Sequence, residues 1–417
     1  MQHGKHILKA NKMIDIELLA PAGSREALEA AIYYGADAVY AAGKTYGLRA
    51  FADNFTESGI KDAADFVHSR GCRLYITLNA IFHEGDFDGL EDYIGALDDA
   101  NVDALIISDP GVMAVAKEVA PNIPIHLSTQ ANTTNARSAA FWHSQGAERV
   151  ILSRELSLKE IRKLRDMTPD SLEIEAFVHG AMCISYSGRC LLSNFFTGRG
   201  GNQGACAQPC RWEYHISERG YDGEYFPVFA DDRGTYIFNS KDMCMLPHLS
   251  DMIDAGIMSL KIEGRMKSAY YVGCVVNAYR RALDDALAGR PFNKALMAEV
   301  NKAGSRAFTT GFFYGNPRES GQDTERNIPQ RTYDFVGVVR SERDADGRIL
   351  VEQRGKFSVG DTLDVLSPNI TGLFDVTDIV AEKGEHRDSA PHAQEMLRIS
   401  CPHELRPGDM LRKKRVL

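Results

Sequence analysis

Short apolar runs rich in β-branched residues alternate with amphipathic stretches through most of the chain, between residues 16 and 288. Runs of this length and composition, bounded by glycine and polar residues, are typical of buried strands. Eight of them are present. The predicted strands are 16–23, 36–43, 72–79, 103–109, 124–132, 149–156, 173–180 and 258–265.

The segments between these strands have the spacing of amphipathic helices, as in "SREALEAAIYYG" and "SLKEIRKLRDM". Ser24 and Ser157 stand where a helix N-cap is expected, and Glu160 follows Ser157 at the spacing of a capping box. Eight strand-then-helix units favour a (β/α)8 TIM-like barrel over an open doubly wound sheet, which usually has five or six strands.

The link between the seventh and eighth strands, about residues 181–257, is far longer than an ordinary loop. Loops that follow barrel strands lie on the catalytic face, so we expect this insertion to cover the barrel mouth. Residues 331–417 contain short strands separated by turns, which predicts a small C-terminal β-barrel domain. The predicted organisation is a flexible lead-in over 1–14, a barrel domain over 15–330 and this second domain.

The net charge of −9 argues against bulk attraction to nucleic acid, so any such binding needs a local basic patch. The basic tail 412–415, "RKKR", is such a candidate, although a solvated surface is the more common role. No apolar run is long enough to span a bilayer, and the first residues lack the apolar core of a signal peptide. We therefore predict a cytoplasmic protein without membrane partners.

Five of the eight cysteines lie between residues 183 and 244, inside the long insertion. In a large cytosolic protein such clustering indicates metal binding or catalysis before disulfides. Four thiolates could hold Zn²⁺ or an iron–sulfur cluster, and the wide spacing slightly favours the cluster. The clustered cysteines are Cys183, Cys190, Cys206, Cys210 and Cys244. The other three are interpreted as core residues.

Polar residues at the predicted strand ends should converge on the barrel mouth. Arg154, Lys261 and Arg265 could bind an anionic substrate, and His179 with Glu263 could form an acid–base pair. Gln130 and Asn132 are further candidates for substrate binding. For any single residue, a salt bridge or helix cap is the more common role. The chain has no H-E-x-x-H and no G-x-S-x-G, so metalloprotease and hydrolase-elbow chemistry lack support.

The stretch "EAFVHGAMCISYSGRCLLS" (175–193) resembles the signature of the peptidase U32 family, the collagenase-like proteases. "LLAPAG", "DAVYAAG", "SLKIEGR" and "RAFTTGF" are similar to other blocks of that family, and the resemblance covers residues 15–330. "NQGACAQPCRWEY" (202–214), together with the C-terminal domain, is most similar to the tRNA hydroxylation branch.

The resemblance implies an oxygen-independent hydroxylase that forms 5-hydroxyuridine at the wobble position of tRNA, with prephenate as the hydroxyl source. It implies a [4Fe–4S] cluster on Cys183, Cys190, Cys206 and Cys244, which leaves Cys210 out. His179, Glu263 and Arg154 are then the catalytic candidates, and Lys261, Arg265, Gln130 and Asn132 the substrate-binding ones. Two alternatives remain open. One is a true peptidase, and the other is a non-catalytic partner subunit of an RNA-modifying complex, in which the cluster is structural and the β-domain docks RNA or protein. A second U32 family subunit is a further predicted partner.

Overall fold

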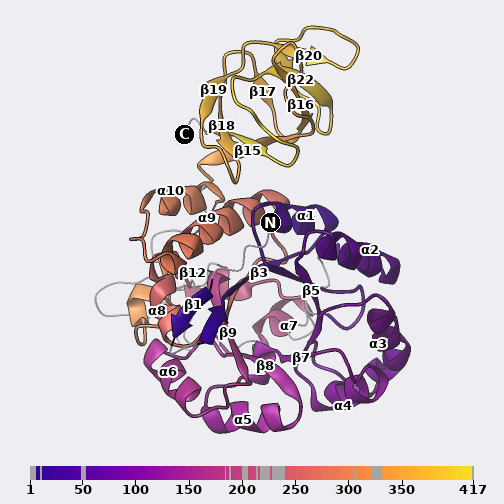
Figure 1. Ribbon diagram of the computed structural model, residues 1–417, viewed down its shortest axis with the longest axis vertical. Coiled ribbons are helices and arrows are strands. Elements are labelled where there is room, and N and C mark those ends of the chain that lie inside the picture. Colours follow the sequence, from indigo (N-terminus) through magenta and orange to yellow (C-terminus); the bar gives the residue numbers. More distant parts are fainter. Residues whose placement is uncertain are drawn as a thin grey trace.

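The computed structural model contains a large α/β barrel and a smaller β domain beside it (Figure 1). The structure describes residues 6–9, 12–47, 53–183, 185–186, 189–199, 205–212, 215–216, 226–227, 240–304, 306–321 and 331–415. Among these, no helix is long and apolar enough to cross a membrane.

Eight parallel strands close into the barrel. They are β3 (Glu17–Pro21), β4 (Ala38–Ala41), β5 (Arg73–Leu78), β6 (Ala104–Ile107), β7 (Ile125–Leu127), β8 (Ala147–Ile151), β9 (Glu173–Ala181) and β13 (Ser259–Ile262). Each strand pairs in parallel with the next, and β13 closes the ring by pairing with both β9 and β3. The predicted TIM-like barrel is confirmed, and each of the eight apolar runs overlaps one strand.

Helices surround the barrel (Figure 1). They are α1 (Arg25–Tyr33), α2 (Glu57–His68), α3 (Leu90–Asp99), α4 (Pro110–Val119), α5 (Ala136–Ser144), α6 (Leu158–Asp166), α8 (Leu249–Asp254), α9 (Ala269–Leu287) and α10 (Ala295–Lys302), with 3₁₀ turns η1 (Glu84–Phe87), η2 (Thr129–Ala131), η5 (Leu246–His248) and η6 (Arg318–Gly321). Ser24 and Ser157 cap α1 and α6, and Glu160 completes a capping box with Ser157. The sequence signals for these helix starts were therefore correct.

The insertion after β9 holds α7 (Leu192–Thr197), η4 (Pro209–Arg211) and the paired strands β10 (His215–Ile216) and β11 (Phe226–Pro227). It rejoins the barrel at β12 (Asp242–Cys244), which pairs antiparallel with the end of β9 and parallel with β14 (Phe308–Thr309). At the other end of the chain, β1 (His6–Lys9) and β2 (Lys12–Asp15) form a hairpin where the sequence predicted a flexible lead-in.

The C-terminal domain is an antiparallel sheet with its own hydrophobic core. Its strands are β15 (Tyr333–Val339), β16 (Arg348–Gln353), β17 (Phe357–Ser358), β18 (Thr362–Leu366), β19 (Leu373–Asp375), β20 (Ile379–Ala381), β21 (Ser389–Ala390), β22 (Met396–Ser400) and β23 (Met410–Lys414). Seven of them follow the order β19-β18-β23-β15-β16-β22-β20, while β17 pairs with β21.

The first residue of the basic tail fastens this domain to the barrel. Arg412 is 1% exposed and forms ion pairs with Glu299 of α10 at 2.5 Å and Asp364 of β18 at 3.3 Å. Lys413 pairs with Asp361 of its own domain at 2.9 Å. Lys414 and Arg415 are exposed, Arg415 in an ion pair with Asp334, so an RNA-phosphate contact by the end of the tail stays a prediction.

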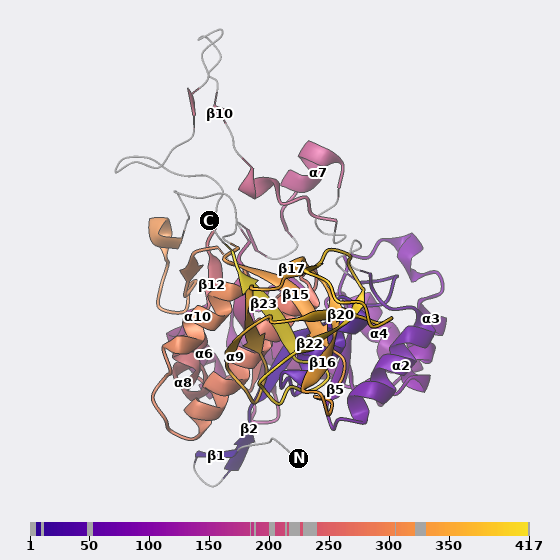
Figure 2. The same ribbon diagram turned by 90° about the horizontal axis from the view of Figure 1, so that it is seen from above.

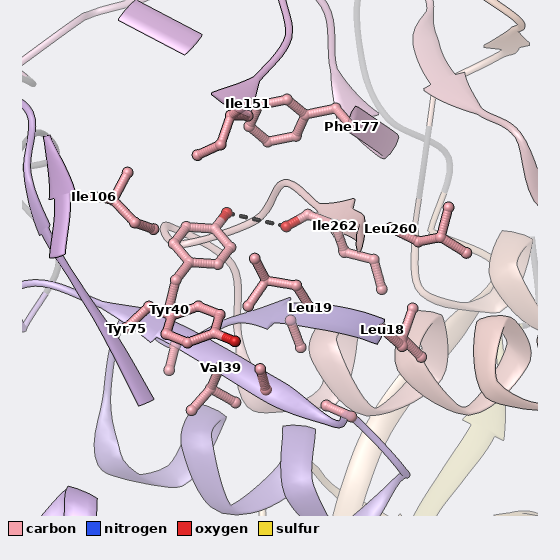
Figure 3. Packing of buried hydrophobic residues seen from close by; sticks show 14 of the residues in the cluster. Leu18, Leu19, Val39, Tyr40, Tyr75, Ile106, Ile151, Phe177, Leu260 and Ile262 are labelled. Atoms are coloured by element: carbon pink, nitrogen blue, oxygen red, sulfur yellow. Dashed lines mark hydrogen bonds between the residues drawn. The ribbon is translucent and has the colours of Figure 1, made fainter. Parts of the chain in front are cut away.

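Aromatic and aliphatic side chains fill the middle of the barrel. Figure 3 shows Tyr40, Tyr75, Ile106 and Phe177 gathered in its centre, while Leu18, Val39 and Leu260 point toward the helices. The hydroxyl of Tyr40 donates to the carbonyl oxygen of Ile262 at 3.0 Å. This packing makes the barrel a solid core, as expected for eight strands.

A network of buried charges lies beside these rings. Arg149 is 3% exposed, and one guanidinium nitrogen lies 2.5 Å from Glu17 and 3.0 Å from Glu175. Lys261 reaches Glu175 at 2.8 Å, and Ser259 donates to Glu17 at 2.8 Å. The residues stand on β3, β8, β9 and β13, so the network joins four strands across the barrel interior. Each charge depends on the others, because an unpaired ion at this depth is costly.

Glu17 shows the strength of these contacts. Burial alone raises the pKa of its carboxyl, but the nearby guanidinium groups of Arg149 and Arg73 and a hydrogen bond from Tyr75 lower that pKa to about 2. A carboxylate with a depressed folded-state pKa stabilises the fold above its unfolded pKa of 4.5. That contribution is lost as the pH falls from 4.5 toward about 2.

We therefore predict that Glu17→Gln lowers the free energy of unfolding at pH 7 by about 3 kcal/mol. The difference from the unmodified protein should shrink as the pH falls through that window, because the native carboxyl then becomes protonated too. Urea denaturation across the pH range measures this. Glu29→Gln, which removes an exposed pair with Arg25, is the control. A pH-independent difference would contradict the predicted ionisation of Glu17.

Candidate active site at the barrel mouth

Arg265 is the best-fixed cation at the C-terminal ends of the strands. It follows β13, is 4% exposed, and donates from its two terminal nitrogens to Thr77 Oγ1 and Asn54 Oδ1, each at 3.0 Å. Thr77 stands on β5, and Asn54 stands in the loop after β4. Both acceptors are neutral side chains, and these two hydrogen bonds hold the guanidinium at the ends of the strands.

Glu263 lies beside Arg265 at the same strand end, and its Oε2 accepts a hydrogen bond of 3.2 Å from the hydroxyl of Tyr40. The neighbouring strand β9 approaches very closely at this point. A Cβ added to Gly180 would lie 2.7 Å from the carbonyl oxygen of Glu263 and 2.8 Å from its Cβ. Gly180 also has a φ of +111°. This crossing of β9 and β13 therefore requires glycine.

Amides and hydroxyls line the mouth around the ends of β5 and β7. Asn79 donates to Ser128 Oγ at 3.1 Å, and Asn132 adopts a left-handed backbone with φ 52°. Within the described part of the chain, the Oδ1 atoms of Asn79 and Asn132 and the Oγ1 of Thr133 are buried without a hydrogen-bond partner. Buried polar atoms are rarely left unpaired, so these three indicate a place where a ligand or water completes the structure. Gln130 is half-buried beside them.

Arg154 connects the mouth to the start of the insertion. It donates to the carbonyl oxygen of Ala181 at 2.6 Å, and its guanidinium lies 3.9 Å from the ring centre of Phe177. Ser153, next to it, forms a hydrogen bond with Glu155. Arg154 thus holds the end of β9, from which Cys183 and the insertion continue.

Lys261 lies deeper than the other predicted cations. Its ammonium is 4.2 Å from the ring centre of Tyr40 and pairs with Glu175 inside the barrel. Burial lowers the pKa of Lys261, and the Glu175 carboxylate opposes part of that shift. The structure therefore places Lys261 in the charge network, away from the strand ends where Arg265 lies.

His179 also lies away from the mouth. Its ring packs against Tyr279, Tyr271 and Phe308, on the side of β9 that faces α9 and β14. Burial lowers its pKa to about 3, so the imidazole is neutral at physiological pH. The pairing of β9 with β13 shifts register between Lys261 and Ile262, and this irregularity breaks the in–out alternation that placed His179 inside. His179 meets Glu263 through the backbone, where the N–H of Glu263 donates to the carbonyl oxygen of His179 at 2.9 Å, while the imidazole packs among aromatic rings.

The predicted metal ligands occupy different environments. Cys183 is exposed, Cys190 and Cys206 are half-buried in the insertion, and Cys210 is similar to them. Cys244 is 4% exposed, and its sulfur accepts a hydrogen bond of 3.8 Å from Tyr279. Burial raises the pKa of the Cys244 thiol to about 11. Within the described ranges, no three His, Cys, Asp or Glu side chains gather as metal ligands.

In comparison with known proteins, each of the two domains matches a protein-family model. The model of peptidase family U32 matches residues 23–323, and the model of the peptidase family U32 C-terminal domain matches residues 331–412. The chain belongs to the peptidase U32 family. This confirms the resemblance that the sequence motifs indicated.

Three curated U32 relatives are similar over nearly the whole chain. The tRNA hydroxylation protein P1 of Bacillus subtilis is 40% identical, over 95% of this chain and 94% of its own. The tRNA hydroxylation protein P of Escherichia coli is 36% identical, over 94% and 95%. A collagenase of Porphyromonas gingivalis is 31% identical, over 95% and 97%.

The thiols of this U32 chain suit an iron–sulfur cluster by their chemistry, because thiolates are the usual ligands. Cys244 pairs opposite His179 near the C-terminal end of β9, and Cys183 follows that same end of the strand. These two thiols therefore lie where the insertion leaves the barrel and rejoins it, while Cys190 and Cys206 lie half-buried within the insertion.

Sequence reasoning missed Thr77, Asn54 and Tyr40, which orient the charged groups of the mouth. Thr77 precedes Asn79 near the end of β5, so its place in "YITLN" was a usable signal. Asn54 lies in a loop, where no periodicity indicates its direction. A pocket beside it is also lined by Lys44, Arg25 and Thr56.

Gly180 allows a direct test of the crossing that positions Glu263. We predict that Gly180→Ala lowers the free energy of unfolding by about 2–4 kcal/mol, because a steric clash adds to the cost of a left-handed backbone. Gly71→Ala is the matched control, since Gly71 has φ +71° but no atoms within 4 Å of an added Cβ. Equal losses in the two variants, measured by chemical denaturation, would show that the close approach contributes nothing.

Proposed function

We propose that this protein is an RNA-modifying hydroxylase that converts the wobble uridine of tRNA to 5-hydroxyuridine without molecular oxygen. The observation that carries the proposal is the identity of 40% and 36% to two tRNA hydroxylation proteins over at least 94% of each chain, both domains included. Prephenate, a dicarboxylate, is the proposed source of the hydroxyl group, with tRNA as the macromolecular partner. A second U32 subunit is a further proposed partner.

The mouth has groups suited to both substrates. Arg265, held by Thr77 and Asn54, places a guanidinium at the mouth, the type of group that binds carboxylates. The unpaired Oδ1 atoms of Asn79 and Asn132 offer acceptors for the N3–H donor of uracil. Glu263, beside Tyr40, is the carboxylate in position to take or return a proton.

We further propose a [4Fe–4S] cluster held by Cys183, Cys190, Cys206 and Cys244. When bound, such a cluster supplies or accepts electrons. The support is the thiolate donor set, three of whose members lie exposed or half-buried in the insertion that follows β9. Cys210, only four residues from Cys206, is the competing ligand.

Proteolysis is a second candidate, favoured by the collagenase relative and by one contact. His143 Nε2 lies 2.9 Å from Ser171 Oγ. The other ring nitrogen of His143 contacts the carbonyl oxygen of Ala147, whereas a serine-protease triad places a carboxylate there. Ala147 begins β8 and Ser171 precedes β9, so this pair lies at the barrel end opposite the mouth. We therefore rank proteolysis below hydroxylation.

Complementation tests the proposed reaction. The chain is expressed in a bacterial host whose own tRNA hydroxylation genes are deleted, and tRNA nucleosides are measured by mass spectrometry. We expect 5-hydroxyuridine-derived nucleosides to return. Arg265→Ala should reduce them by about 10-fold or more, because the guanidinium at the mouth is lost. Glu29→Gln, which removes an exposed ion pair with Arg25, is the control.

Two results would contradict the proposal. One is an absence of the modified nucleosides with protein present at normal levels. The other is proteolysis of denatured collagen that Ser171→Ala abolishes, without any change in tRNA.

Iron and acid-labile sulfide, measured after anaerobic purification, test the cluster. We expect about four of each per chain. Single serine substitutions at Cys183, Cys190, Cys206 and Cys244 should each lower both values, while Cys210→Ser should not. Cys72→Ser, at a half-buried cysteine on the barrel exterior, is the control. Zinc in place of iron, or full iron content in Cys244→Ser, would contradict the assigned ligands.

A further inference from the structure

Three aromatic rings stand exposed together on the insertion. Phe195 is 81% exposed, Phe196 45% and Trp212 46%. The ring centres of Phe195 and Phe196 are 5.1 Å apart, and those of Phe196 and Trp212 are 6.2 Å apart. We call these three side chains the aromatic platform. Large apolar groups that remain in water as a cluster usually mark a binding surface.

The platform is held by local hydrogen bonds. Phe195 and Phe196 lie on α7, and Trp212 directly follows η4. Ser193 Oγ of α7 accepts from the backbone N–H of Ala207 at 2.9 Å. Arg199 donates to the carbonyl oxygen of Ala205 at 3.0 Å. These bonds fix α7 relative to the segment that leads into η4, so the three rings form one surface.

The platform lies over the barrel mouth. In Figure 1, α7 is seen through the middle of the ring of strands, behind them. In the perpendicular view of Figure 2, α7 stands beyond the end of the barrel opposite the β1–β2 hairpin. The hairpin lies next to the start of β3, so α7 is on the side where the parallel strands end. A ligand on the platform would therefore face the groups around Arg265.

The charge of this segment differs from that of the whole protein. Between residues 176 and 212 the chain has Arg189, Arg199 and Arg211 and not one Asp or Glu, although the protein carries a net charge of −9. Exposed rings among arginines, without carboxylates, are the composition of surfaces that bind unpaired nucleic acid. A protein partner would more often meet a mixture of both charges at the rim.

We propose that the aromatic platform stacks the unpaired bases of an RNA loop and holds that loop over the barrel mouth. This inference rests on the proposed function and adds to it the surface that recognises the substrate. Phe195, Phe196 and Trp212 supply ring faces for successive bases, while Arg199, which follows α7, supplies positive charge for an adjoining phosphate. Stacking is tolerant of base identity, so the platform positions the loop and leaves base selection to the mouth.

Binding of a fluorescently labelled anticodon stem-loop to the full-length, anaerobically purified protein tests this by fluorescence anisotropy. Phe195→Ala combined with Phe196→Ala, and separately Trp212→Ala, should weaken binding by about 10-fold or more. Phe195→Tyr combined with Phe196→Tyr should bind within about twofold of the unmodified protein, because the ring faces remain. Phe195→Leu combined with Phe196→Leu should bind as weakly as the double alanine variant.

Two controls separate stacking from other effects. Phe141→Ala removes a ring that is 57% exposed from α5, on the outside of the barrel, and should leave binding unchanged. A fully paired RNA hairpin stem should bind weakly to every variant. Thermal unfolding shows whether each variant is folded, and the tyrosine variant remains informative if an alanine variant is not.

Three results would overturn the inference. Unchanged RNA binding by the alanine variants would do so, even if the protein hydroxylates tRNA. Full binding by the leucine variant would show simple apolar contact instead. Loss of self-association in the alanine variants, with RNA affinity intact, would assign the platform to a second copy of the chain. By contrast, platform-dependent RNA binding without tRNA hydroxylation would support the platform and refute the proposed reaction.

Discussion

The barrel depends on charges buried where its strands meet. Arg149, Glu17 and Glu175 would each be costly at this depth alone, and each is stable because the strands that carry them pair in one register. A shift of one residue in any strand would turn its charged side chain toward the helices and leave an ion unpaired. The network therefore opposes wrong registers more strongly than an apolar interior would, and it fixes where each strand ends.

The buried charge network also fixes the positions of the side chains at the barrel mouth. Arg265 comes four residues after Lys261, whose ion pair with Glu175 fixes β13 relative to β9. The close crossing at Gly180 then sets Glu263 beside Tyr40, itself packed over Lys261. Side chains supported in this way need little reorganisation when a substrate arrives, which is how preorganised sites gain their effect. The insertion instead lies on top of this rigid base, joined to it near Ala181 and at β12.

The sequence was enough to predict the barrel because its signal is repeated eight times. Apolar runs, caps such as Ser157 and glycine-rich turns indicate the same strand-then-helix arrangement in each unit. An ambiguous signal at one position therefore did not change the predicted fold. The same pattern could not distinguish Lys261 from Arg265. Both are cations at one predicted strand end, and only the position of Glu175 on a neighbouring strand determines that the lysine is paired inside. The sequence pattern could not reveal the pairing of Arg412 either, because its ion-pair partners Glu299 and Asp364 are distant in sequence.

The alternation of side chains along a strand did not predict the direction of His179. Alternation along β9 puts Glu175 and Phe177 inside the barrel and predicts the same for His179. That rule assumes that the neighbouring strand pairs in a constant register. Here the register of β9 with β13 shifts, and β12 pairs antiparallel with the same stretch of β9. The strand turns, and the imidazole becomes part of the apolar layer under α9. A neutral, buried histidine beside Tyr279 supports β9 at the place where the insertion begins. It thus bears on the direction of the segment that carries Cys183, not on proton transfer at the mouth.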